Sequence, residues 1–160
     1  MISGIEEGQV FAVPLTKDIL AIGVIARVDR KKGGRRKPHI VFAYFFGPYL
    51  AAPTIEQLQR LTVEDAVMRR KCSILNLYDG KWKIIGRIQD WSREKWPLPV
   101  FYRNDLLVGT VLIRFSDDDL VTPLQELRYK GGDIALSDEN STSGSGAVEI
   151  RLRQKLNISE

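Results

Sequence analysis

Short apolar segments separated by turn signals dominate the first third of the chain. Residues 8–15 (GQVFAVPL), 20–28 (LAIGVIARV) and 40–46 (IVFAYFF) are rich in the β-branched and aromatic residues that favour strands. Only residues 16–19 join the first two segments, and a Gly-Pro pair ends the third. Three successive strands joined by turns predict an antiparallel meander.

Glycines within the apolar segments indicate curvature. Gly23 lies in the second segment, and Gly86 lies in a later one, residues 80–88 (GKWKIIGRI). A glycine inside a strand is typical of a bend, a bulge or a close approach by another part of the chain. Several such strands in 160 residues predict a mainly β fold, α+β by content. We expect a curved antiparallel sheet or a small, partly open SH3-like barrel.

One segment with helical spacing interrupts the strands. Thr54 and Gln57 form a capping-box pattern at its start. The apolar residues that follow recur at helical rather than alternating intervals; they are Leu58, Leu61, Ala66 and Val67. We predict a helical segment over residues 55–70, broken near Thr62, that packs across the open side of the sheet.

Further strands are predicted in the middle of the chain. Residues 73–78 and 80–88 flank the turn dipeptide Asp79-Gly80, and this arrangement predicts a hairpin. Residues 106–115 (LLVGTVLIRF) are apolar and β-branched, which predicts another strand.

The composition changes after Gly131. Residues 137–146 (SDENSTSGSG) are polar and rich in serine and glycine, which is typical of a flexible loop. Apolar and charged residues then alternate over 147–156, which predicts a strand that returns to the sheet. The predicted organisation is one β domain over residues 1–130, followed by a polar loop and a C-terminal strand within residues 131–160.

Two tryptophans lie in a charged segment without regular periodicity, residues 89–96 (QDWSREKW), and two prolines follow. We interpret this segment as an ordered loop. One possibility is that Trp91 and Trp96 close an end of the core. The alternative is that one or both are exposed anchors for a partner, with Arg93 between them, since Trp and Arg are common at interface hot spots.

The net charge of +4 comes from a single loop. Six cations lie within eight positions: Arg30, Lys31, Lys32, Arg35, Arg36 and Lys37. Without these six charges the chain would carry −2, so the basicity does not spread over a domain face. The loop is either a solvated hairpin tip that protects a sheet edge or a contact arm for an acidic partner or phosphates.

The residues needed for common catalytic and metal sites are scarce. Cys72 is the one cysteine and His39 the one histidine, which argues against a disulfide, a zinc set and a Ser-His-Asp triad. We expect Cys72 to be buried, and the acids of residues 116–119 (SDDD) to cap a turn or to be solvated. We therefore expect no enzyme activity, no cofactor and no metal.

The chain also lacks features of a membrane or secreted protein. It contains no apolar run of about 18 residues, so no membrane span is expected. Its first residues (MISGIEEG) are acidic and do not resemble a secretory signal. A single cysteine fits a reducing compartment, and we expect the protein to be cytoplasmic.

Several of these segments, taken together and in order, resemble one family. They are Gly8–Leu15, Ile22–Val24, Phe42–Pro48, Pro53–Leu58, Gly80–Ile88 and Asp90–Phe101. The set resembles the immunity protein 26 family of bacterial polymorphic toxin systems, over roughly residues 7 to 120. The basic loop and the region after Gly131 lie outside the resemblance.

The resemblance implies a mainly β cytoplasmic protein that binds and neutralises a toxin domain. Our first hypothesis is therefore a non-enzymatic immunity protein that occludes its toxin. The alternative is a small nucleic-acid-binding β-barrel that uses the basic loop 30–37, with Trp91 stacking on bases. The resemblance supplies no toxin-contact residue. The candidate partner-binding residues come from the pattern alone: Trp91, Arg93, Trp96, Arg30, Lys31, Lys32, Arg35, Arg36 and Lys37.

Overall fold

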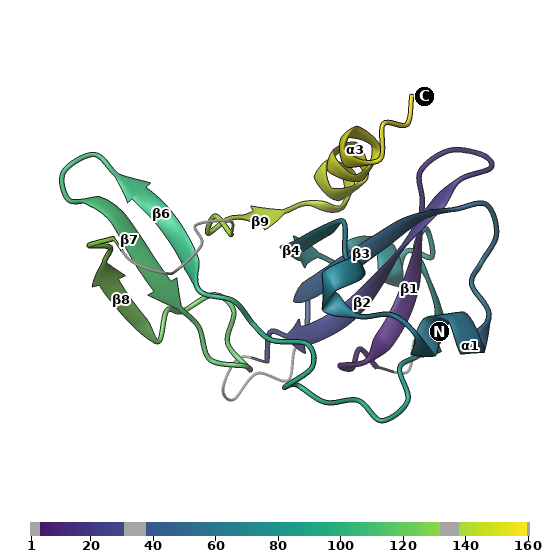
Figure 1. The fold of residues 1–160 in the computed structure, drawn as a ribbon, viewed down its shortest axis with the longest axis horizontal. Helices are drawn as coiled ribbons and strands as arrows, with labels where there is room; N and C mark the ends of the chain where they lie inside the picture. Colours follow the sequence, from purple (N-terminus) through teal and green to yellow (C-terminus); the bar gives the residue numbers. More distant parts are fainter. Residues whose placement is uncertain (1–3, 31–37, 132–137, 160) are drawn as a thin grey trace.

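A computed structural model describes residues 4–30, 38–131 and 138–159 of the chain, and these residues form two β-sheets and a C-terminal helix (Figure 1). The larger sheet has the strand order β5-β1-β2-β3-β4-β9 and the smaller one the order β6-β7-β8. Neither sheet is closed, so the mainly β prediction is confirmed in its open, curved form. Figure 1 shows the smaller sheet projecting away from the larger one.

The predicted meander forms the centre of the larger sheet. Its strands are β1 (Gln9–Pro14), β2 (Leu20–Val28) and β3 (Ile40–Tyr49), paired antiparallel in that order. β4 (Met68–Ser73) pairs antiparallel with β3, and the two-residue β9 (Thr142–Ser143) pairs in parallel with β4. The opposite edge is β5 (Lys83–Arg87), which pairs with β1.

Both faces of the larger sheet are buried, which explains why its central strands are apolar on both sides. Phe11, Ile25 and Phe45 face one cluster, which also contains Trp82 from the segment before β5. The other cluster contains neighbouring residues of the same strands, together with residues of the smaller sheet. A strand covered on both faces has no polar side to present to water, so its sequence is a continuous apolar run rather than an alternation.

Two glycines act as the sequence predicts. A Cβ on Gly23 would lie 2.3 Å from Cζ of Phe11, so only a glycine admits that ring. At Gly86 the pairing of β1 with β5 shifts register, which is the predicted bulge. A Cβ at Gly86 would also lie 2.8 Å from Cδ1 of Leu58.

The predicted helix over residues 55–70 is shorter and in two parts. α1 (Ile55–Gln59) begins at the capping box, in which Thr54 Oγ1 accepts from Gln57 N and Gln57 Oε1 accepts from Thr54 N. The 3₁₀ turn η1 (Val63–Asp65) follows Thr62, so the predicted break is confirmed. Residues 68–70 are strand instead, because β4 gains a ladder with β3 there.

The predicted hairpin around Asp79-Gly80 is wrong. Residues after β4 form the short helix α2 (Leu75–Tyr78), in which Leu77 is buried and Leu75 is exposed. The Tyr78 hydroxyl donates to the Pro38 carbonyl oxygen over 2.6 Å. The strand that follows, β5, pairs with β1 rather than with residues 73–78, because this places Trp82 next to the ring of Phe11.

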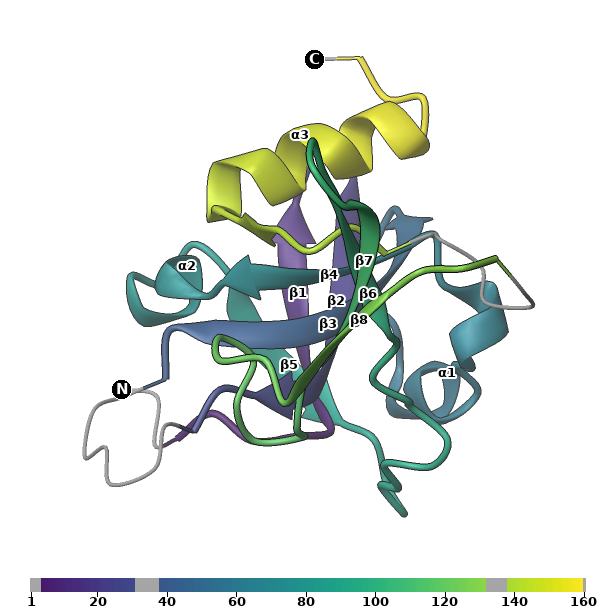
Figure 2. The same ribbon diagram turned by 90° about the vertical axis from the view of Figure 1, so that its left-hand side faces the viewer.

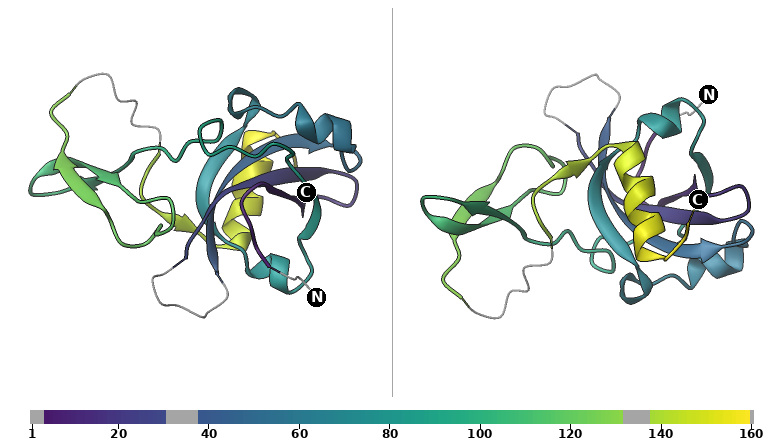
Figure 3. Two further views of the ribbon diagram at one scale, coloured as in Figure 1. Left: turned by 90° about the horizontal axis from the view of Figure 1, so that it is seen from below. Right: turned by 90° about the horizontal axis from the view of Figure 1, so that it is seen from above.

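The predicted C-terminal strand is also wrong, because residues Ser145–Lys155 form helix α3. Val148 and Leu152, four residues apart, are buried against the larger sheet, whereas Ile150 between them is half exposed. Apolar residues at positions 148, 150 and 152 fit the alternation of a strand. The buried pair, Val148 and Leu152, is four residues apart and therefore also fits one face of a helix. Figure 2 shows α3 lying across one end of the larger sheet, and Figure 3 shows it within the curve of that sheet.

The smaller sheet was predicted only in part. It consists of β6 (Phe101–Asp105), β7 (Gly109–Arg114) and β8 (Gln125–Arg128), all antiparallel. The predicted strand over 106–115 starts only at Gly109, since Leu106, Leu107 and Val108 form the turn between β6 and β7. The Asp105 carboxylate accepts from Leu107 N and Val108 N at this turn. Of the polar segment 137–146, the described residues contribute β9 and the start of α3.

Candidate partner-binding surface

The two tryptophans of the charged loop have different roles. Trp96 is only 3% exposed and packs edge-to-face against Tyr44 and Phe46, so it closes the core and is not a surface anchor. Trp91 is half-buried and stacks on Trp96 with 5.6 Å between ring centroids. Trp91 also lies against Gly8, where an added Cβ would lie 3.2 Å from its Cδ2. Of the two, only Trp91 reaches the surface.

Arg93 is held by carboxylates of the same chain. Its Nε and Nη2 donate to the two oxygens of Glu7 over 2.8 and 2.6 Å. Nη2 also lies 3.1 Å from Oδ1 of Asp118, and Nη1 lies 3.6 Å from Oδ2 of Asp117. Burial raises the pKa of Glu7, but the hydrogen bonds and positive charge of Arg93, with smaller effects of Trp91 and Arg27, together lower that pKa overall. A partner that contacts Arg93 therefore has to compete with three intramolecular acids.

A buried arginine fixes the loop to the larger sheet. Arg27 of β2 is 3% exposed, and its Nη1 donates to the carbonyl oxygens of Ala26 and Trp96 over 2.7 and 2.9 Å. Its Nε lies 2.6 Å from Oδ1 of Asp117, which neutralises the charge. Since the bonds to Trp96 and Asp117 cross between segments, Arg27 gives the tryptophan loop one defined position.

Arg30, at the base of the basic loop, lies near Arg93 and Trp91. Arg30 is exposed, its backbone N donates to Asp118 O over 2.7 Å, and its Nη2 donates to Ile5 O over 3.2 Å. Asp118 thus connects Arg30 with Arg93. Trp91 lies beside them, and its Nε1 donates to Oε1 of Glu7 over 3.4 Å. Lys31, Lys32, Arg35, Arg36 and Lys37 lie outside the described residues.

The consecutive acids of residues 116–119 have separate partners. Asp119 Oδ1 accepts from the backbone N of Val121 and of Thr122, which is the predicted capping role. Asp117 and Asp118 pair with arginines, a role that sequence reasoning missed. The sequence signal for these pairings was Arg27, because a lone cation in an otherwise apolar strand needs a carboxylate partner. In the described part, no three His, Cys, Asp or Glu side chains gather as a metal site would require.

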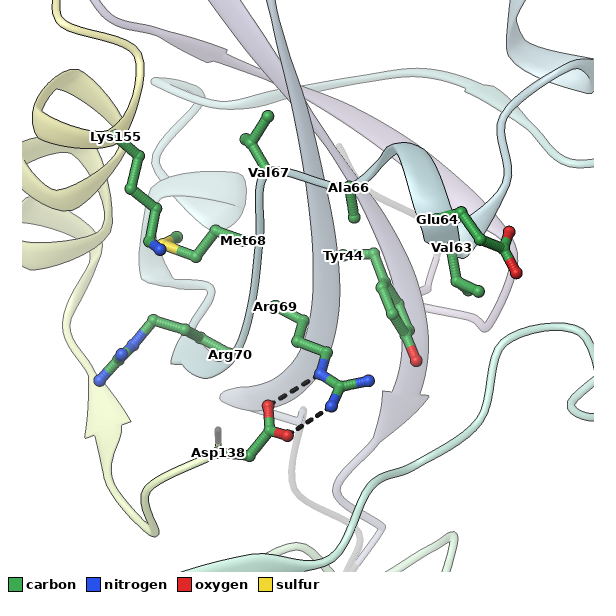
Figure 4. Close-up of a pocket in the computed structure, with 10 residues that line it drawn as sticks. All are labelled: Tyr44, Val63, Glu64, Ala66, Val67, Met68, Arg69, Arg70, Asp138 and Lys155. Atoms are coloured by element: carbon green, nitrogen blue, oxygen red, sulfur yellow. Dashed lines mark hydrogen bonds and ion pairs between the residues drawn. The ribbon is translucent and has the colours of Figure 1, made fainter. Parts of the chain in front are cut away.

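A cleft of about 470 Å³ opens between β4, η1 and the C-terminal segment (Figure 4). Arg69 lies at its centre and forms a two-bond ion pair with Asp138 (2.8 and 2.5 Å). Arg70 donates to Ser143 Oγ and Ser141 Oγ over 2.8 and 2.9 Å. The cations of this cleft therefore hold the segment around β9 against β4, and its lining includes neither His39 nor Cys72.

The cysteine is not a nucleophile in this fold. Cys72 of β4 is completely buried, as expected from the sequence, and burial raises the pKa of its thiol to about 12. A thiol with this pKa is almost entirely protonated at neutral pH, and the thiolate is the reactive form. His39 is exposed and lies edge-on to Tyr78, with 5.9 Å between ring centroids.

Comparison with protein families tests the resemblance seen in the sequence. The family model described as Immunity protein 26 matches residues 6–110, which is more than half of the chain. The chain belongs to the immunity protein 26 family. Comparison with curated proteins and with solved structures gives no match.

The part matched by immunity protein 26 covers β1 to β6, the tryptophan loop and the turn after β6. All nine candidate residues lie within the matched range, so the match also spans the basic loop, which the resemblance did not include. Most of β7, all of β8 and β9, and α3 lie beyond it. No helix in the described part of this immunity protein 26 member is long and apolar enough to cross a membrane.

Proposed function

We propose that this chain is a non-enzymatic immunity protein that binds a cognate toxin domain in the cytoplasm and neutralises it by covering its active site. The observation that carries the proposal is membership of the immunity protein 26 family over residues 6–110. The partner follows from that family description, since an immunity protein acts on a toxin.

The chemistry of the described residues supports a binding role. The thiol of Cys72 is buried and protonated, and Arg27 and Arg93 are neutralised by carboxylates of the chain. These contacts hold the loops in one conformation before a partner arrives. A preorganised surface loses little conformational entropy on binding, which favours a tight complex.

In this role, Arg30 and the basic loop attract the toxin. Charges at the rim of an interface mainly accelerate encounter between partners of opposite charge. Arg93, by contrast, already forms ion pairs with Glu7 and Asp118 and is better suited to hold the loop than to contact the toxin.

Co-expression tests the proposal directly. The chain is produced together with the C-terminal domain of the secreted toxin encoded beside it, and growth is compared with cells that carry the toxin alone. We expect restored growth and a complex of the two proteins in a pull-down. The pull-down includes nuclease treatment, so that bridging through a nucleic acid is excluded. Absence of both protection and a complex would contradict the proposal.

A further inference from the structure

Exposed aliphatic side chains concentrate on the smaller sheet. In the described part, six of the ten large hydrophobic residues that are exposed lie between residues 106 and 127: Leu106, Leu107, Val108, Val121, Leu124 and Leu127. Leu107 is 93% exposed and Leu106 completely so, which means that neither stabilises the fold by burial. These residues lie in the β6–β7 turn, in β8 and in the loop between β7 and β8, and apolar groups exposed in such number on one part of a protein surface mark an interaction site.

The two faces of the smaller sheet differ. Phe101 and Ile113, which are paired across β6 and β7, are buried in the cluster shared with the larger sheet. Tyr102 pairs with Leu112, and Leu112 with Leu127, so these three side chains form a row on the opposite face. Tyr102 and Leu112 are partly exposed and Leu127 is 49% exposed. An apolar row therefore crosses the sheet and ends at β8.

The two edges of the smaller sheet also differ. The chain itself covers the edge at β6, where Tyr102 N donates to Asp138 O over 3.0 Å and Asn140 N donates to Tyr102 O over 2.7 Å. β8 is the other edge, and all four of its residues are exposed. Figures 1 and 3 show this edge on the side of the projecting sheet away from the larger sheet.

The register identifies which backbone groups β8 presents. Tyr129 N donates to Thr110 O over 2.8 Å, and Leu127 is paired with Leu112 in the same register. Bonded and non-bonded pairs alternate along an antiparallel ladder, so the N–H and C=O groups of Glu126 and Arg128 point outward. An exposed edge of this kind is a template for a strand from another chain.

The charges around this edge determine the chemistry of the strand it would accept. Arg103 is neutralised by Glu126 at 2.5 Å, and Asp105 caps the turn that follows β6. Arg114, Arg128 and Lys130 are exposed cations, and within the described residues no ion pair joins any of them to a carboxylate. This excess of positive charge favours an acidic partner over a second copy of the same chain. Aliphatic side chains, unlike aromatic ones, offer no stacking platform for nucleic-acid bases.

We infer that the toxin docks on the smaller sheet by adding an exposed strand, which carries apolar and acidic side chains, to the β8 edge, while Leu106 and Leu107 at the β6–β7 turn enter an apolar pocket of the toxin. This inference rests on the proposed function and deepens it. The β8 edge fits a partner-specific contact, because β8 and most of β7 lie beyond the segment matched by the family, whereas Leu106 and Leu107 lie near the end of that segment.

Three variants of the full-length chain test the docking surface. Leu106→Asp/Leu107→Asp places charges at the apolar tip. Glu126→Pro removes an N–H that points toward the partner and also the carboxylate that pairs with Arg103, and it is tolerated at an edge because the ladder with β7 does not use that N–H. Leu50→Asp/Leu75→Asp is the matched control, since both leucines are exposed and lie outside the smaller sheet.

The probe is the C-terminal domain of the neighbouring toxin, inactivated by substitution, with affinity measured by calorimetry. We expect the tip variant to weaken binding by about 100-fold and Glu126→Pro by about 10-fold. The control should bind within about twofold of the wild type, and all three variants should retain the wild-type circular dichroism spectrum.

The outcomes separate this inference from the proposed function. Wild-type affinity in both sheet variants overturns the inference alone, because the toxin then binds elsewhere. A dimer of the free chain that Glu126→Pro abolishes, with unchanged toxin affinity, assigns the edge to a second copy and also overturns it. A wild-type chain that does not bind the toxin overturns the proposed function and this inference together.

Discussion

The guanidinium of Arg27 donates to the carbonyl oxygen of Trp96 over 2.9 Å, inside the molecule. The same side chain forms an ion pair with Asp117, so one residue of β2 holds both the tryptophan loop and the acidic turn. A buried donor of this kind leaves unsatisfied acceptors when it is removed. The order of the surface around Trp91 therefore depends on Arg27.

Substitution of this anchor should lower stability. Arg27→Met removes the ion pair and the bonds to three carbonyl groups, those of Ala26, Arg93 and Trp96, and we expect the free energy of unfolding to fall by about 2–4 kcal/mol. Arg87→Met is the control, because Arg87 forms an exposed pair with Glu6, and such pairs contribute roughly 0–1 kcal/mol. Urea denaturation followed by tryptophan fluorescence measures both. Equal losses in the two variants would contradict the anchoring role.

Two glycines should respond to alanine in opposite directions. A methyl group at Gly23 would meet the ring of Phe11, which stacks on Trp82 and cannot move away, so Gly23→Ala should destabilise by about 1–3 kcal/mol. Gly146 lies in α3, and an added Cβ there meets nothing within 4 Å. Gly146→Ala should therefore stabilise by about 0.5–1 kcal/mol. Thermal unfolding of both variants checks the signs.

Lys71 makes stability depend on pH. Its ammonium lies 4.0 Å from the centre of the Phe115 ring, 3.3 Å from Leu120 O and 2.5 Å from Asn140 Oδ1. Burial lowers the pKa of Lys71 to about 8, against the opposing effect of Asp29. The unfolded chain therefore binds more protons than the folded chain between pH 8 and the ordinary lysine pKa, so this residue's contribution to stability rises with pH in that window.

The difference in stability between the wild type and Lys71→Met isolates this effect. Other groups that titrate at alkaline pH contribute equally to both proteins, so their effects cancel. We expect the free energy of unfolding of the wild type to rise by about 1 kcal/mol relative to the variant between pH 7 and pH 9. Urea titrations at the two pH values measure it, and a constant difference would show that Lys71 is not desolvated.

The strands that are buried on both faces were predictable from sequence. Residues 20–28 gave β2 with the bounds observed, because a continuous apolar run that contains a glycine has few other structures available to it. The capping box at Thr54 was equally local, and its hydrogen bonds form as the pattern requires. Where the information lies within a few residues, the sequence was sufficient.

The errors arise where partners are distant in the chain. An alternation at Val148, Ile150 and Leu152 fits a strand, and only the curve of the larger sheet determines that a helix fills it. Leu106 and Leu107 are an exception, because the Asp105 carboxylate that makes this segment a turn, by accepting from Leu107 N and Val108 N, is close in the chain. The partners of Arg27 and Arg93 come from residues up to 90 positions away, which no local pattern contains.

The central claim is that the chain neutralises its toxin by occlusion rather than by chemistry. The most direct test titrates a fixed amount of active toxin domain with the purified chain, at a toxin concentration well above the dissociation constant. Occlusion predicts that toxin activity falls in proportion to the added chain and reaches zero at one molar equivalent. Loss of toxin activity at a small fraction of an equivalent would reveal turnover, and full toxin activity at several equivalents would show that no inhibitory complex forms. Either of these two results would contradict the account.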